Sequence, residues 1–335
     1  MDIAVFGQHF IVGLSGSRLL PEERKLLKQL RPLGIILFAK NMVQDAPDWQ
    51  RLLSELITDV KRELERDQVL ISIDHEGGRV YRFPDTDTVT HFGYARQWRD
   101  NARAVGETMG RELASLGINL NFAPVVDVDS EPENPVIGER AFSPSPREVA
   151  FYAKEFIQGM HSQGVLGCLK HFPGHGATKK DSHFELPVLP ETMEVLWDRE
   201  LLPYRELFQD NHPPLVMSAH VNYPKIDPHY PATLSSIILR DLLRHKLGFR
   251  GAVISDDMFM GALQKISLEE RTLGAIQAGI DIFLEGNPTE ETLPLAEAVK
   301  KAEILRQALA QGKLTGEIFE QSQGYIGTVT SYPLS

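Results

Sequence analysis

The chain has 335 residues, of which 42% are hydrophobic and 24% are charged, the balance of an ordinary globular enzyme. Its formal net charge of −11 argues against nucleic acid or an anionic membrane as a partner, because both call for a basic surface. The single cysteine excludes an intrachain disulfide, and neither a basic leader nor a long charge-free stretch is present, so we expect a cytoplasmic protein.

Eight short apolar runs recur along the chain, each followed by a longer stretch, and this alternation predicts strands and helices in turn. The predicted strands are Phe10–Leu14, Gly34–Phe38, Val69–Ile73, Ile118–Ala123, Gly164–Leu169, Leu215–Met217, Ala252–Ile254 and Ile280–Leu284. The predicted helices are Pro21–Leu30, Ala46–Glu65, Asn101–Leu116, Pro146–Ser162, Glu191–Gln209, Ser235–Leu247 and Glu291–Ala310, with a weaker pattern at Met258–Ala278.

Eight such units favour an α/β fold, a single (β/α)8 TIM-type barrel over residues 1–335, rather than an open doubly wound sheet. No glycine-rich dinucleotide-binding motif follows any of the predicted strands, which also argues against the open sheet. The end of the chain, Thr315–Ser335, lacks helical periodicity and is expected to wrap the barrel or fray.

Polar residues stand where the predicted strands end, and in barrels of this kind the active site lies at the C-terminal ends of the strands. We therefore expect one active site at that end of the barrel. The groups concerned are Asp74-His75-Glu76, Asp127-Val128-Asp129, Lys170-His171, Ser218-Ala219-His220, Ser255-Asp256-Asp257 and Glu285. Of these, the Ser218-Ala219-His220 group is expected to supply hydrogen bonds behind the site.

Residues 170–183 read KHFPGHGATKKDSH, and the density of Gly and Pro in them predicts a shaped loop. Asp181 and His183 flank a single serine, close enough for the carboxylate to orient the imidazole. Since histidine titrates near neutral pH, the pair is a candidate proton shuttle. The alternative is an ordinary exposed histidine in a glycine-rich loop.

Asp256 follows an apolar strand and should emerge at the mouth of the barrel, where a carboxylate can act as a nucleophile or stabilise positive charge. By residue type alone the N-cap of a helix is the better explanation, because Asp is common at that position. The Asp181–His183 pair on another loop favours the catalytic interpretation.

His171, His175 and His183 together raise the alternative of a metal-dependent amidohydrolase. Zinc hydrolases favour compact His pairs, and the interval between His171 and His175 falls in a loop where helical spacing does not apply. We therefore expect neither a metal nor another cofactor.

The segment SIDHEGGRVYRF, residues 72–83, combines carboxylates, arginines and two glycines that allow close backbone approach, which suits a ligand with vicinal hydroxyls. We expect Asp74 and Arg82 to face the ligand. Glu76 and Arg79 are expected to be structural, in an internal network of ion pairs.

These segments together resemble family 3 glycoside hydrolases of the β-N-acetylglucosaminidase type. The resemblance is carried by KHFPGHG followed by DSH (170–183), and by DHEGGRVYRF (74–83), GERAF (138–142), MSAHVNYP (217–224) and ISDDMFMGAL (254–263). It covers about residues 10–290. Three positions depart from the usual family pattern, namely His75, Ala252 and Phe259. Because the chain ends soon after the barrel, it resembles the single-domain bacterial enzymes of peptidoglycan recycling.

The resemblance implies Asp256 as nucleophile and His183 as acid/base, oriented by Asp181. It further implies five contacts to an N-acetylglucosamine unit, from Asp74, Arg82, Arg140, Lys170 and His171. The expected protein is a monomeric retaining exo-β-N-acetylglucosaminidase acting on a small saccharide or muropeptide. A substrate-assisted hexosaminidase, the metal-dependent amidohydrolase and a sugar-binding barrel without catalysis remain alternatives.

Overall fold

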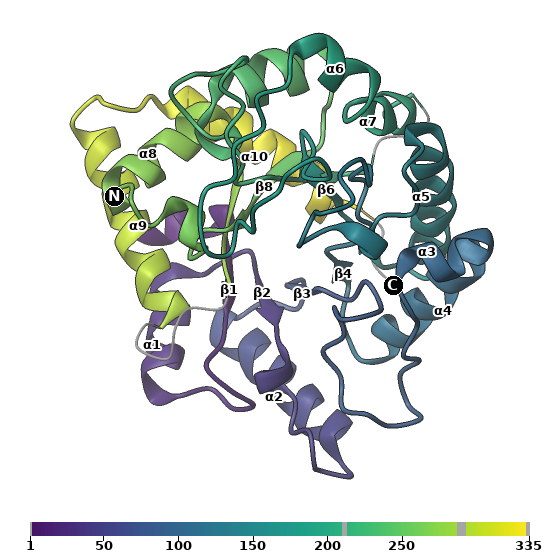
Figure 1. Cartoon of the computed structure of the whole chain (residues 1–335). Coiled ribbons are helices and arrows are strands. Elements are labelled where there is room, and N and C mark those ends of the chain that lie inside the picture. The colour runs from purple at the N-terminus through teal and green to yellow at the C-terminus, as the bar shows by residue number, and fades with distance from the viewer. Residues whose placement is uncertain (1, 210–212, 287–292, 333–335) are drawn as a thin grey trace.

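The computed structural model describes residues 2–209, 213–286 and 293–332. Parallel strands form a barrel and helices surround it (Figure 1). The strands are β1 (Phe10–Gly13), β2 (Gly34–Leu37), β3 (Leu70–Ile73), β4 (Leu120–Asn121), β5 (Leu166–Gly167), β6 (Leu169–Phe172), β7 (Leu215–Ser218), β8 (Ala252–Asp257) and β9 (Ile282–Glu285). The predicted TIM-type barrel is confirmed, because each strand pairs in parallel with its neighbours in the expected order.

The fifth strand of the barrel is divided into β5 and β6 by the fully buried Cys168. β5 pairs with β4 and β6 pairs with β7, so the two ends of the sheet are joined through one continuous segment and the barrel closes. The strand predicted at Gly164–Leu169 was therefore placed too early, and Lys170 and His171 lie inside β6. Polar side chains can occupy this strand because buried partners across the barrel mouth satisfy them.

The helices largely follow the prediction, with two interruptions. They are α1 (Pro21–Leu30), α2 (Trp49–Leu64), α3 (Ala95–Trp98), α4 (Ala102–Ser115), α5 (Pro146–His161), α6 (Met193–Asp198), α7 (Leu202–Leu207), α8 (Leu268–Ala278), α9 (Pro294–Ala310) and α10 (Gly316–Thr330), with a π-helix at Ile237–Lys246. The helix predicted at Glu191–Gln209 is two helices, since Pro203 stands in the first turn of α7 and supplies no peptide N–H. The stretch Met258–Ala278 is a loop followed by α8, and the predicted start at Glu291 lies outside the described residues.

The expectation that Thr315–Ser335 is irregular was wrong, because residues 316–330 form α10. Ile326 and Val329 of this helix pack with the side chains that fill the inside of the barrel, including Ile11, Leu120 and Ile254. Gly and Ser weaken the helical pattern of the segment, but burial of these apolar side chains stabilises the helix.

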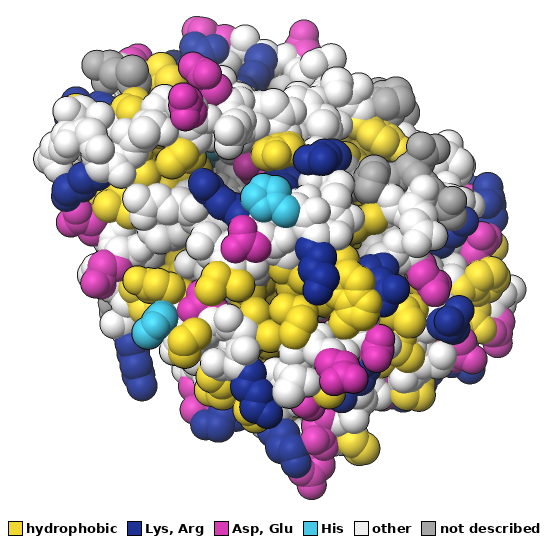
Figure 2. Space-filling view, turned by 90° about the horizontal axis from the view of Figure 1, so that it is seen from above, with side chains coloured by type: hydrophobic (Ala, Val, Ile, Leu, Met, Phe, Trp, Pro, Cys, Tyr) yellow, Lys and Arg dark blue, Asp and Glu magenta, His cyan; other side chains and the backbone are white. Residues whose placement is uncertain are grey.

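A second and larger apolar core lies between the strands and the surrounding helices, where it holds the barrel rigid. On the face shown in Figure 2, acidic and basic side chains are interspersed rather than gathered into a basic stripe. Within the described ranges, none of the helices is both long and apolar enough to cross a bilayer.

Candidate active site

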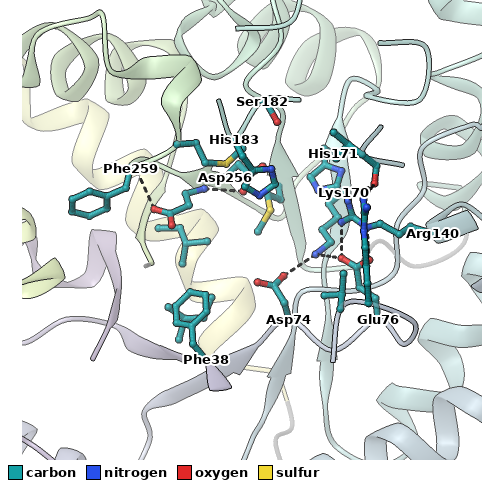
Figure 3. Close-up of a pocket in the computed structure, with 18 of the residues that line it drawn as sticks. Phe38, Asp74, Glu76, Arg140, Lys170, His171, Ser182, His183, Asp256 and Phe259 are labelled. Atoms are coloured by element: carbon teal, nitrogen blue, oxygen red, sulfur yellow. Dashed lines mark hydrogen bonds and ion pairs between the residues drawn. The ribbon is translucent and has the colours of Figure 1, made fainter. Parts of the chain in front are cut away.

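A cavity of about 650 Å³ opens where the barrel strands end (Figure 3). All eight side chains that the sequence singled out line it: Asp74, Arg82, Arg140, Lys170, His171, Asp181, His183 and Asp256. The cavity is also lined by Asp257, which the sequence placed at a strand end, and by Phe38, Lys40, Phe259 and Met260, which it had not assigned to the site. Phe38 and Phe259 lie across the cavity from Arg140 and Glu76 in Figure 3. One wall therefore carries two aromatic rings beside Lys40 and Asp257, and the opposite, charged wall carries Arg140 and Glu76.

The charged wall is a network of ion pairs. Lys170 Nζ lies 2.8 Å from Asp74 Oδ1 and 2.6 Å from Glu76 Oε1. Arg140 donates from Nε and from a terminal nitrogen to the two oxygens of Glu76, both at 2.8 Å. The expectation that Glu76 belongs to an internal ion-pair network is confirmed, whereas Arg79 is an exposed side chain that donates to the carbonyl of Val136.

The network keeps its groups charged although they are largely buried. Burial opposes the charge of Lys170, but the Asp74 and Glu76 carboxylates outweigh it and raise the pKa of Lys170. Burial likewise opposes the charge of Glu76, and Arg140 and Lys170 nevertheless hold the pKa of Glu76 well below its ordinary value. A fixed array of charged donors and acceptors therefore faces the cavity, as recognition of hydroxyl groups requires.

Arg82 is a half-buried residue that borders the same cavity. Its Nε is buried and makes no hydrogen bond within the described part of the chain. Since a buried donor without a partner is costly, this nitrogen is suited to bind a ligand oxygen.

Asp127 holds His171 in place. It is 1% exposed, and its Oδ2 lies 2.7 Å from Nδ1 of His171. Its Oδ1 accepts the peptide N–H of His175 at 2.6 Å. The sequence placed Asp127 at a strand end without assigning it a role, because the pairing depends on how two strands lie side by side.

Asp256 lies in β8 and is half-buried at the cavity. Burial works against its ionised form, but the imidazoles of His171 and His220 and the peptide N–H of Asp257 hold the pKa of Asp256 below its ordinary value. The N-cap alternative is wrong, because Ser267 caps the next α-helix. Asp256 is therefore an ionised carboxylate at the barrel mouth.

Asp181 orients His183. Its Oδ1 lies 2.7 Å from Nδ1 of His183 and also accepts the peptide N–H of His183 at 2.9 Å. Burial opposes the charge of Asp181, but these two contacts lower the pKa of Asp181. The imidazole is 61% exposed, and Figure 3 shows it beside Asp256. With Nδ1 engaged, Nε2 is the nitrogen that can exchange a proton with a ligand.

The Ser218-Ala219-His220 group supplies hydrogen bonds behind the cavity, as expected. His220 Nδ1 lies 2.7 Å from Thr233 Oγ1, and His220 Nε2 lies 3.1 Å from the carbonyl oxygen of Asp257. The ring thus supports the backbone next to Asp256.

The three histidines proposed as metal ligands do not converge. Nδ1 of His171 is occupied by Asp127, and both ring nitrogens of His175 are occupied by hydroxyl groups. Among the described residues there is no group of three His, Cys, Asp or Glu side chains placed to hold a metal ion.

A (β/α)8 barrel whose mouth brings together an ionised carboxylate, a group able to exchange a proton and a charged array suited to hydroxyl groups has the parts that a glycoside hydrolase needs. The chain belongs to glycosyl hydrolase family 3, since residues 8–329 match the glycosyl hydrolase family 3 N terminal domain.

The names of similar proteins are consistent with this family. The chain is 34% identical over 328 residues to a beta-hexosaminidase of Idiomarina loihiensis, with 93% of this chain and 96% of the relative covered. It is 40% identical over 290 residues to a beta-hexosaminidase of Alkalilimnicola ehrlichii, with 84% and 81% covered.

Solved structures agree in fold over almost the whole chain. A family 3 beta-N-acetylglucosaminidase from Paenibacillus superposes with a TM-score of 0.89 at 32% identity, covering 99% of this chain. The present chain spans only 62% of the length of that structure. A beta-N-acetylhexosaminidase from Beutenbergia cavernae superposes with a TM-score of 0.86 at 27% identity, and 98% of each chain is covered.

Proposed function

We propose that this glycoside hydrolase is a retaining exo-β-N-acetylglucosaminidase. Its substrate is N-acetylglucosamine linked β-1,4 to anhydro-N-acetylmuramic acid, free or with a peptide, and it releases the non-reducing sugar. One observation carries the proposal: Asp256 and the Asp181–His183 pair line the same cavity as the charged array around Lys170. The beta-hexosaminidase names of the relatives supply the choice of an N-acetylated sugar.

In the first step Asp256 attacks the anomeric carbon, and the bond from that carbon to the leaving oxygen breaks. His183 gives its Nε2 proton to the leaving oxygen, while Asp181 stabilises the imidazolium before transfer. The product is a glycosyl ester on Asp256. The lowered pKa of Asp256 supports this role, because only the ionised carboxylate is a nucleophile.

In the second step water replaces Asp256 at the anomeric carbon, and His183 takes the proton of the attacking water. Two displacements restore the β configuration. Retaining enzymes commonly use two carboxyl groups, one of them as the acid. A histidine in that place repels neither Asp256 nor an anionic muramic-acid leaving group, either as the imidazolium that gives the proton or as the neutral imidazole that remains, whereas a second carboxylate does once it has lost its proton.

The sugar to be released lies against the charged wall, where five side chains offer one carboxylate and several donors to ring hydroxyls: Asp74, Arg82, Arg140, Lys170 and His171. A buried protein group that loses its hydrogen bond to a sugar hydroxyl costs roughly 1–3 kcal/mol of binding free energy. Sugars that lack such a hydroxyl are therefore bound more weakly. Asp74 remains 20% exposed although it binds Lys170, which leaves it accessible to a ligand.

The choice of a small muropeptide as substrate is supported by the composition of the whole chain. A net charge of −11 and a single cysteine favour a cytoplasmic enzyme acting on small muropeptides over one that binds anionic polymeric cell wall. We also propose that residues 1–335 form a single catalytic barrel domain that acts as a monomer.

The test compares specificity constants on nitrophenyl substrates. The enzyme should prefer nitrophenyl N-acetyl-β-glucosaminide to the corresponding β-glucoside, and cleave the anhydromuramic disaccharide faster than intact peptidoglycan. A preference for the glucoside contradicts the sugar assignment, and rapid cleavage of peptidoglycan contradicts the recycling role. Activity that disappears with a chelator and returns only with zinc supports the amidohydrolase class, and failure to release nitrophenol supports a binding protein.

A second candidate is substrate-assisted hydrolysis, in which the acetamido oxygen attacks and two carboxylates assist. It is favoured by the fact that Asp256 and Asp257 both line the cavity. Against it, Asp257 Oδ1 accepts the peptide N–H of Phe259 and of Gly286, both at 3.1 Å, which fixes that carboxylate in the loop. Strong inhibition by a thiazoline, without a covalent adduct on Asp256, would decide for this candidate.

A further inference from the structure

His175 lies beneath the loop that carries the catalytic pair and has no role in the mechanism above. It is 1% exposed, and both of its ring nitrogens are engaged. Nε2 lies 3.0 Å from Oγ of Ser182, and Nδ1 lies 2.8 Å from Oγ1 of Thr178. A buried side chain with both nitrogens engaged is fixed in orientation.

These contacts are compatible with one fully paired arrangement of protons. Thr178 Oγ1 also lies 3.0 Å from the carbonyl oxygen of His175; when its hydroxyl donates there, Thr178 accepts from Nδ1. Nε2 then accepts the hydroxyl proton of Ser182. Burial lowers the pKa of His175 to about 4, so the ring is neutral at pH 7, as this arrangement requires.

Ser182 stands between the two members of the catalytic pair and is the anchored residue of the three. It is 2% exposed, whereas the side chains of Asp181 and His183 are 29% and 61% exposed. Its carbonyl oxygen also accepts the peptide N–H of Ala262 at 3.2 Å. Ser182 therefore supplies the buried side chain of this segment, while the catalytic side chains on either side are more exposed.

The same histidine is tied to the sugar-binding wall. Its peptide N–H donates to Oδ1 of Asp127 at 2.6 Å, and Oδ2 of Asp127 binds Nδ1 of His171. The acid/base loop and one of the proposed sugar contacts thus share a single chain of hydrogen bonds.

We propose that His175 is a positioning residue, which through Ser182 fixes the direction of the His183 imidazole toward the leaving oxygen. The inference depends on the acid/base role of His183 proposed above. Displacing a proton donor by about 1 Å lowers the rate by up to about 100-fold. Loss of the anchor should therefore weaken proton donation and leave sugar binding and nucleophilic attack largely intact.

The first test uses Ser182→Ala, which removes only the hydroxyl group that contacts His175. Specificity constants are measured on aryl N-acetyl-β-glucosaminides from dinitrophenyl to phenyl. We expect a loss of about tenfold or more on the phenyl substrate and less than about twofold on the dinitrophenyl substrate, because only poor leaving groups need the proton. Ser322→Ala is the matched control, because Ser322 is a buried serine of α10 whose Oγ likewise lies near a histidine nitrogen, 3.3 Å from Nδ1 of His9. The control variant should show the same leaving-group dependence as the wild type.

A second test distinguishes the roles of the two ring nitrogens of His175. In His175→Gln the amide can replace Nε2 and bind Ser182, whereas in His175→Asn it can replace only Nδ1 and bind Thr178. We expect the Gln variant to retain most activity on the phenyl substrate and the Asn variant to resemble Ser182→Ala. Equal losses in the two variants contradict the proposal and indicate a role in packing alone.

A third measurement places Ser182→Ala in the His183→Ala background. If the anchor acts through His183, the double variant is no slower than His183→Ala alone. Additive losses, or equal losses across the leaving groups, overturn the proposal. If His183→Ala itself shows no leaving-group dependence, the proposed function fails as well; if it does and Ser182→Ala does not, only this inference fails.

Discussion

The peptide N–H of Gly261 donates to the carbonyl oxygen of His183 at 3.0 Å. This bond joins the segment that follows Asp256 to the loop that carries the proposed acid/base. The two backbones approach so closely that a Cβ on Gly261 would lie 2.7 Å from the carbonyl oxygen of His183 and 2.6 Å from that of Phe184. The absence of a side chain at Gly261 therefore allows the catalytic groups to meet.

Gly261→Ala should push the loop away from Asp256, because backbone oxygens cannot move independently of the chain. We expect a loss of about tenfold or more in the specificity constant on the phenyl substrate and a smaller loss on the dinitrophenyl substrate. Gly324→Ala is the control, since a Cβ there meets nothing within 4 Å. An unchanged profile for Gly261→Ala shows that the loop reaches its place without this close approach.

Asp256→Ala should reduce turnover by several orders of magnitude with little effect on the melting temperature, because the carboxylate stands at the cavity rather than in a core. A fluorinated sugar that slows the second step should leave a mass adduct on the peptide containing Asp256. An adduct on a different residue removes Asp256 from the role of nucleophile.

His183→Ala should slow the natural disaccharide far more than a dinitrophenyl glycoside, whose leaving group needs no proton. Asp181→Asn should give a milder form of the same pattern, because it keeps the size of the side chain that bonds Nδ1 of His183 but removes its charge. Specificity constants on the two substrates provide the measurement. Equal losses on both would exclude His183 as the acid.

The sequence was sufficient to predict the barrel and part of its mouth from local pattern, whereas Arg140 was indicated only by the family resemblance. Alternating apolar runs predicted the strands, and several of the residues expected at their ends, among them Asp74, Lys170 and Asp256, line one cavity. The partners of those residues were harder to predict. That Asp127 holds His171, or that His175 holds Ser182, depends on side-chain directions across strands and loops that no spacing reveals. The helix α10 was missed because its stability comes from apolar packing inside the barrel rather than from its own composition.

Glu200 lies against Gly174, in the loop that leads to the catalytic pair. It is 1% exposed, Arg199 Nε binds its Oε1 at 2.7 Å, and its Oε2 makes no hydrogen bond within the described residues. Burial raises the pKa of Glu200 from 4.5 to about 7, although Arg199 opposes the shift. The folded state therefore binds this proton more tightly than the unfolded state does.

The sign of the resulting pH dependence follows from that difference. The stabilisation is fully present below about pH 4.5, where both states carry the proton, and it is lost as the pH rises through about 7, where the folded state must bury a charge. A shift of this size corresponds to about 3 kcal/mol. Glu200→Gln, which resembles the protonated side chain, should match the wild type near pH 4.5 and be more stable at pH 8. Chemical unfolding at both pH values provides the measurement, with Glu191→Gln as the control because Glu191 binds the same Arg199 but is 33% exposed. If the stabilities of Glu200→Gln and the wild type change in parallel with pH, Glu200 carries the same charge in the folded and unfolded states.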